Sequence, residues 1–135
     1  MKIVIDTYAW IELLIGSEKG YKVKQYMENA DEIYTPGTVL AETARKFLRE
    51  GVDGQTITIW LEVIIASSEI AQIDSTTALE AAKCQLELAQ KAKNSKLNTP
   101  SLFDAIVLAT ARTKQCKILT ADEHFKNLPE TIWIN

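Results

Sequence analysis

The stretch KIVIDTYAWIELLIG, residues 2–16, carries the pattern from which the rest of the fold can be worked out. Its largely apolar run at residues 2–5 is typical of a short buried strand, which would end at the acid Asp6. Residues 7–15 then favour a helix, for which Gly16 is a suitable end. A buried strand followed directly by a helix is the repeating unit of an α/β protein.

Further apolar runs alternate with helical patterns along the chain. Ser17 is a suitable cap for a second helix, and Thr35-Pro36 combines a hydroxyl cap with a proline at the first helical position. Asp53 would cap a helix through Ala66, although the β-branched residues there leave a strand as an alternative. The other expected strands are residues 32–35, 69–73, 117–120 and 131–134. The other expected helices run to about residue 29, from 35 to about 51, from 74 or 75 to about 93, and from 102 to about 114.

Strands that alternate with helices predict a parallel sheet with helices on both faces and right-handed crossovers. The most economical strand order is 3-2-1-4-5, in which the chain builds outward from strand one and then returns to its other side. The direction in which successive strands are added to the sheet would then reverse between strands one and four. Sites in such sheets gather beside that switch point, at the carboxyl ends of the strands.

The composition is that of an ordinary globular protein. The 135 residues fit one domain spanning 1–135, and 47% of them are hydrophobic, enough for a core. We expect neither a signal peptide nor a membrane span, because the apolar runs are short and interrupted by acids. The two cysteines fit no metal or redox spacing and indicate a reduced, cytoplasmic protein. The net charge of −3 counts against nucleic-acid binding unless bound cations reverse the local charge.

Four acids fall where such a fold collects its functional residues. Asp6 ends strand one, and Asp122 follows strand four, its expected neighbour. Asp104 lies in the first turn of the helix before strand four, and Glu42 in the second turn of the helix after strand two. Because like charges packed together are costly, such a cluster is typical of a site for a hard divalent cation such as Mg²⁺. One cation can activate a water and a second can stabilise the leaving oxygen, the two roles that phosphodiester hydrolysis requires.

Each acid also has a purely structural interpretation. Asp104 stands three residues after Ser101 and resembles the acidic member of a capping box. Glu42 alone would be ordinary on a solvated helix face. Asp122 could cap the short segment after it, and Asp6 could cap the helix that follows it. The conjunction of the four carries more weight than any one of them.

The chain has several other candidate site residues. His124, the only histidine, is expected to be a solvated loop residue rather than a ligand. Two basic stretches are typical of solvated helix faces, but beside a phosphate-binding rim they could guide an RNA backbone. These stretches are Lys91, Lys93 and Lys96, and Arg45, Lys46 and Arg49. The three tryptophans, at 10, 60 and 133, are expected in the core, with Trp60 and the segment 57–66 also candidates for an interface edge.

Four motifs in order along the chain resemble those of PIN domains, and specifically those of the toxin ribonucleases of VapBC toxin–antitoxin pairs. They are IVIDTYAWIELL (residues 3–14), LAETARKFLR (40–49), SLFDAIVLATA (101–111) and ILTADEHF (118–125). Each is weak alone, but the ordered set spans nearly the whole chain. Some family members carry a further Asp or Asn near the last motif, where this chain has Glu123 and His124.

The resemblance implies a three-layer α/β/α sandwich with a five-stranded parallel sheet. It also implies Mg²⁺-dependent cleavage of RNA, with Mn²⁺ as a substitute and a 5′-phosphate and a 3′-hydroxyl as products. Carried over by position, it makes four acids the catalytic and metal-holding residues: Asp6, Glu42, Asp104 and Asp122. It gives supporting roles to Thr7, Thr120 and Arg45. A homodimer and a small VapB-like antitoxin are the partners it implies.

Other classes of function fit the chain less well. A haloacid-dehalogenase phosphatase would have a second acid two residues after Asp6, where Tyr8 stands. A receiver domain would have an acidic pair, and a nucleotide-triphosphate enzyme would have a glycine-rich phosphate loop; the chain has neither. Two alternatives stay open: an RNA- or protein-binding PIN module with weak or no catalysis, and a housekeeping RNA-processing PIN nuclease.

Overall fold

The chain forms a five-stranded, all-parallel sheet in the order β3-β2-β1-β4-β5, which confirms the predicted topology. The computed structural model describes all 135 residues. The strands are β1 (Lys2–Ile5), β2 (Glu32–Pro36), β3 (Glu69–Ala71), β4 (Lys117–Thr120) and β5 (Thr131–Trp133). The helices are α1 (Thr7–Ile15), α2 (Glu18–Asn29), α3 (Gly37–Arg49), α4 (Gly54–Ser67), α5 (Ser75–Asn94) and α6 (Leu102–Lys114), with a single 3₁₀ turn, η1 (Glu123–Phe125).

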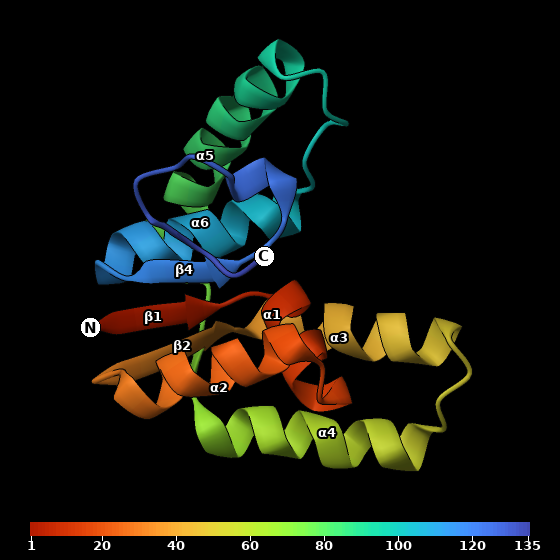
Figure 1. Cartoon of the computed structure of the whole chain (residues 1–135). Helices are drawn as coiled ribbons and strands as arrows, with labels where there is room; N and C mark the ends of the chain where they lie inside the picture. The colour runs from red at the N-terminus through yellow and green to blue at the C-terminus, as the bar shows by residue number, and fades with distance from the viewer.

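Helices cover the sheet on both sides, which confirms the α/β/α sandwich. Figure 1 shows α5 and α6 above the strands and α2 and α4 below them, with β1 between the two groups. No helix is both long and apolar enough to cross a membrane.

The central strand β1 lies at the heart of the core. Its residues Ile3, Val4 and Ile5 are fully buried, as is usual for a strand covered by helices on both faces. The main core joins β1 and β4 to α6, and Trp10 is fully buried in it. A smaller cluster of Ile11, Phe47 and Ile57 ties α1 to α3 and α4.

The other two tryptophans are only partly buried. Trp60 packs against the smaller cluster, with its ring 4.6 Å from that of Phe47, and Trp133 packs against the main core. Both therefore lie at the edge of the core rather than in its centre.

Thr35 does not cap a helix, so that prediction was wrong. Thr35 belongs to β2, where it pairs with Ile70, and α3 begins after Pro36 without a side-chain cap. The Thr35 hydroxyl is fully buried and is engaged elsewhere: it accepts from Trp10 Nε1 (3.0 Å) and lies 2.7 Å from Ser68 Oγ. Burial in the sheet thus outweighed the local capping signal.

Two other sequence-based boundaries differ from the structure. Residues 57–66 are helical, so the strand alternative is wrong: Ile57 and Ile64 point inward seven residues apart, and Asp53 caps α4. The third strand ends at Ala71 rather than at residue 73, and Ile73 is half exposed. Of the two residues predicted to cap the next helix, 74 and 75, Asp74 is the cap of α5: its side chain accepts from the Thr77 N–H at 2.8 Å.

Candidate active site

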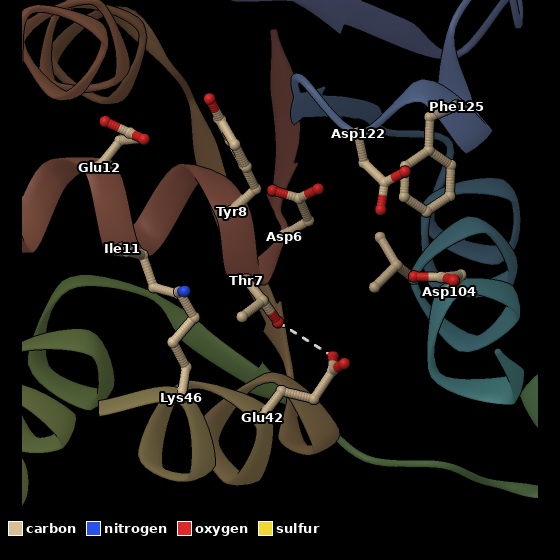
Figure 2. Close-up of a pocket in the computed structure, with 11 residues that line it drawn as sticks. Asp6, Thr7, Tyr8, Ile11, Glu12, Glu42, Lys46, Asp104, Asp122 and Phe125 are labelled. Carbon is tan, nitrogen blue, oxygen red and sulfur yellow. Dashed lines mark hydrogen bonds between the residues drawn. The ribbon is translucent and has the colours of Figure 1, made fainter. Parts of the chain in front are cut away.

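An open cavity of about 410 Å³ lies beside the carboxyl ends of β1 and β4, at the switch point of the sheet. All four predicted acids line it. Figure 2 shows the side chains of Asp6, Asp104 and Asp122 facing a common space, with Glu42 approaching from α3. The remaining lining residues are Thr7, Tyr8, Ile11, Glu12, Lys46, Val107 and Phe125.

Asp6 is the most buried acid of the site, with 4% of its surface exposed. Its Oδ1 accepts from the Ala9 N–H at 2.9 Å, so Asp6 also caps α1, as one of its structural interpretations proposed. Its Oδ2 accepts from the Thr120 hydroxyl. Burial raises the pKa of Asp6 to about 7, and the nearby Asp122 and Asp104 add to the rise, against the lowering effect of these two hydrogen bonds.

Thr120 connects the two acids at the switch point. Its fully buried hydroxyl donates to Asp6 and accepts from the Asp122 N–H at 2.9 Å. One residue of β4 therefore holds the side chain of Asp6 and the backbone of Asp122 in register.

Asp104 begins α6 as part of a capping box. Its Oδ2 accepts from the Ser101 N–H (2.9 Å), and the Asp104 N–H donates to the Ser101 hydroxyl (3.2 Å). The structural interpretation of Asp104 is thus confirmed, but it leaves Oδ1 without a hydrogen-bond partner beside the cavity. Burial raises the pKa of Asp104 above its usual value, and Asp122 adds to the rise.

Glu42 is half-buried rather than solvated and faces the same cavity from α3. Its Oε1 accepts from the Thr7 hydroxyl at 3.0 Å, the contact drawn in Figure 2. Burial raises the pKa of Glu42, while the Thr7 hydrogen bond and the nearby Arg45 lower it. Thr7 therefore links the helix that follows β1 to the helix that follows β2.

His124 is not a solvated loop residue, so that prediction was wrong. Its Nδ1 lies 2.9 Å from Asp122 Oδ1, and its Nε2 lies 2.7 Å from the Asn98 carbonyl oxygen. Burial lowers the pKa of His124, but the Asn98 carbonyl and the Asp122 carboxylate outweigh it and raise the pKa above its usual value. The η1 turn, which Asp122 caps, folds the imidazole back onto that acid.

The four acids are not equally close to one another. Ligand atoms of Asp104, Asp122 and His124 lie within 4.8 Å of one another, which is close enough to share one ion. Asp6 and Glu42 line the same cavity but stand outside this tight group.

The carboxylates of the cavity are largely without counter-ions. Asp6, Glu42 and Asp104 form no ion pair, and Asp122 pairs only with His124. Unpaired, partly buried carboxylates raise one another's pKa and cost free energy. Their free oxygens are the hard donors that Mg²⁺ and Mn²⁺ prefer, so the donor set fits a divalent cation.

Sequence reasoning missed two polar side chains that line the cavity, those of Tyr8 and Glu12. Tyr8 and Glu12 stand four residues apart on α1, and Lys46 stands four residues after Glu42 on α3. Residues four apart share a helix face, so Lys46, which was expected as part of a basic stretch, lies on the face of α3 that carries Glu42.

The chain belongs to the PIN-domain family, whose family model matches residues 3–130. Membership of this family indicates a nuclease, a hydrolase of phosphodiester bonds, of a kind that generally uses divalent metal. No curated protein sequence matched the chain.

Solved structures share the fold at low sequence identity. A VapBC complex from Salmonella typhimurium bound to DNA is 17% identical, with a TM-score of 0.75 over 100% of this chain and 99% of that one. A toxin–antitoxin complex from Klebsiella pneumoniae is 20% identical, with a TM-score of 0.67 over 98% of each chain. VapC20 of Mycobacterium tuberculosis, described as a toxin that cleaves the sarcin–ricin loop, is 16% identical, with a TM-score of 0.59 over 84% of this chain and 83% of that one.

Proposed function

We propose that this chain is a metal-dependent endoribonuclease and the toxin of a type II toxin–antitoxin pair. The observation that carries the proposal is the convergence of four carboxylates on one open cavity, three of them without a counter-ion. Such an arrangement costs stability unless it serves a cation. The toxin assignment and a VapB-like antitoxin partner are supported by the structural relatives, several of which are toxin–antitoxin complexes.

The assigned site comprises Asp6, Glu42, Asp104 and Asp122 as the acids that hold Mg²⁺, or Mn²⁺ in its place. A divalent cation bound there would supply an activated water and would stabilise charge on the phosphate and on the leaving oxygen. The carboxyl group of Asp6, with its pKa of about 7, would give up its proton when the cation binds.

The residues around the acids hold them in place. Thr120 and the Ala9 N–H orient the Asp6 carboxylate, Thr7 orients Glu42, and the Ser101 cap orients Asp104. Fixed ligand orientation of this kind supports metal affinity in known sites. His124 positions Asp122 and is a candidate ligand in its own right.

The surface of the protein also has a place where a partner protein could bind. Leu13, Leu14, Met27, Ile33, Trp60 and Val63 line a mainly apolar surface groove of about 560 Å³ between α1, α2 and α4. An exposed apolar groove of this kind is typical of a protein–protein contact and supports a protein partner such as the antitoxin. A homodimer in the cytoplasm completes the proposal; the two cysteines are free and buried, as in a reducing compartment.

The test is cleavage of a panel of single-stranded and structured RNAs by wild type and by Asp104→Asn, with Mg²⁺, Mn²⁺ or EDTA. We expect cutting that requires the metal, leaves a 5′-phosphate and a 3′-hydroxyl, and falls at least about 100-fold in the variant. A 2′,3′-cyclic phosphate product would contradict the mechanism. Equal cutting by the two proteins would overturn the assigned site.

A growth assay separates a toxin from a housekeeping nuclease and from an inert binding module. Expression of the wild-type chain alone should arrest a bacterial host, and Asp104→Asn should not. Cleavage in vitro without growth arrest would favour the housekeeping reading. Metal binding with no cleavage of any RNA would favour the binding module.

A further inference from the structure

A second cavity, of about 230 Å³, adjoins the candidate active site along α3. It contains no hydrophobic residue. It shares three lining residues with the catalytic cavity: Thr7, Glu42 and Lys46. Its other lining residues are Arg45, Arg49 and Glu50. A polar cavity therefore lies beside the acids on the side of α3.

The cations of this second cavity are not all neutralised. Lys46 pairs with Glu50 at 2.8 Å. Arg45 and Arg49, the α3 arginine pair, are exposed and make neither an ion pair nor a side-chain hydrogen bond. The second cavity is lined by three cations (Arg45, Lys46 and Arg49) and two acids (Glu42 and Glu50), so its lining is slightly positive in a chain of net charge −3.

The α3 arginine pair extends away from the acids along the axis of α3. Arg45 lies close enough to Glu42 to lower its pKa. Arg49 stands one helical turn farther on, about 6 Å along the helix axis. On the α1 side, the lining of the catalytic cavity includes Tyr8 and the acid Glu12, and Lys19 donates to the Tyr8 hydroxyl at 2.9 Å. The α3 arginine pair therefore supplies free positive charge on the α3 side of the acids.

We propose that the α3 arginine pair binds backbone phosphates of the RNA on one side of the bond that is cut. The inference rests on the proposed ribonuclease function and adds a positioning subsite to it. A guanidinium group presents a planar fork of N–H donors that matches a phosphate, and unlike Lys46 these two arginines have their donors free. The pair reads no base, so it fixes the register of the strand rather than its sequence.

The experiment compares Arg45→Gln/Arg49→Gln with a control of equal charge change, Lys22→Gln/Lys83→Gln, whose residues are exposed and line neither cavity. Binding of a 5′-fluorescein-labelled, mixed-sequence 12-nucleotide RNA is measured in EDTA between 50 and 200 mM KCl. Loss of two phosphate contacts should flatten the slope of log K against log salt by about 1.4 and weaken binding at 50 mM KCl about tenfold or more. The control should keep the wild-type slope and affinity to within about twofold.

Two further readouts distinguish positioning from a structural effect. With a cleaved RNA, the double variant should raise KM about tenfold and leave kcat within about threefold, and Arg45→Lys/Arg49→Lys should recover part of the affinity. Shortening the RNA on one side of the cut should weaken wild type but not the double variant, and shortening on the other side should affect both equally.

The possible outcomes separate this inference from the proposed function. Unchanged salt slope and KM in a wild type that cleaves would overturn the arginine subsite alone, as would an equal loss in the control variant. Arginine-dependent RNA binding by a wild type that does not cleave would support the subsite and overturn the nuclease. A wild type that neither binds nor cleaves RNA would overturn both.

Discussion

At the scale of single residues, Asp6 combines two roles whose demands conflict. As the cap of α1 it accepts hydrogen bonds, which favour the charged carboxylate; as a buried group it is disfavoured in that form. Burial prevails, and the pKa of Asp6 rises to about 7. Without a cation, the folded chain therefore holds a proton on Asp6 that the unfolded chain releases near pH 4.

This difference predicts how stability depends on pH. Between about pH 4 and 7 the native state binds more protons than the unfolded state, so the free energy of unfolding falls as pH rises. In EDTA we expect the Asp6 carboxyl to lower the free energy of unfolding by about 1 to 4 kcal/mol between pH 5 and 8. The measurement is urea unfolding of wild type and of Asp6→Asn at both pH values.

The comparison with Asp6→Asn isolates this carboxyl from other titrating groups, including Glu42 and Asp104, whose pKa values are also raised. The variant should lose less stability than wild type from pH 5 to pH 8. Saturating Mg²⁺ at pH 8 should restore wild type more than the variant. A wild type that becomes more stable relative to the variant as pH rises would contradict the account.

At the scale of secondary-structure elements, three of the four candidate site acids stand at the start of a helix or 3₁₀ turn. Asp6 caps α1, Asp104 belongs to the capping box of α6, and Asp122 caps η1. A cap must stand where a helix meets the end of a strand or loop, and in this sheet those places surround the switch point. The structural and the catalytic interpretations of these acids are therefore compatible.

The capping box of α6 offers a test of that coupling. Ser101→Ala removes the hydroxyl that accepts from the Asp104 N–H and should lower stability by about 1 kcal/mol. Because the first turn of α6 carries Asp104, Mn²⁺ affinity should also fall about tenfold, as for other residues that orient metal ligands. Both quantities are measured on the same protein, by denaturant unfolding and by titration calorimetry.

Two control variants make the comparison specific. Ser101→Thr keeps the hydroxyl and should retain both stability and Mn²⁺ affinity. Asp74→Ala removes the cap of α5, which does not line the cavity, and should lower stability by a similar amount while Mn²⁺ affinity stays unchanged. Equal losses of Mn²⁺ affinity in Ser101→Ala and Asp74→Ala would show that the effect is not specific to the placement of Asp104.

At the scale of the whole molecule, the core joins segments from both ends of the chain. Residues of β1, β4, α5 and α6 share one main cluster. The ion pairs of Arg112 with Glu87 and Glu130, at 2.6 and 2.8 Å, tie α6 to α5 and to the segment before β5. We expect residues 1–135 to unfold as one cooperative domain.

Leu108→Ala tests this expectation. Leu108 is fully buried in α6, so its truncation should cost about 3 kcal/mol. Tryptophan fluorescence, which includes Trp60 of α4, and far-UV circular dichroism should report the same shifted midpoint. Two separate transitions, or a shift seen by one probe only, would contradict a single domain.

The positions of most strands and helices in this protein were determined by local sequence alone. Short apolar runs ended by acids or turn residues specified the strands, and Asp53, Asp74 and Ser101 marked helix starts, because these signals act within a few residues. The alternation of elements with right-handed crossovers then left few strand orders, and the predicted one is observed. The strand order in turn predicted that acids distant in sequence would lie at one edge of the sheet.

Only the tertiary structure decided what each side chain contacts. Thr35 looked like a helix cap, but burial against Trp10 keeps it in β2. His124 was predicted to be solvated, but the η1 turn places its ring between Asp122 and the Asn98 carbonyl. The free charge of Arg45 and Arg49 likewise depends on which acids lie within reach. Such contacts join residues far apart in the chain or depend on how a loop folds, so no local pattern encodes them.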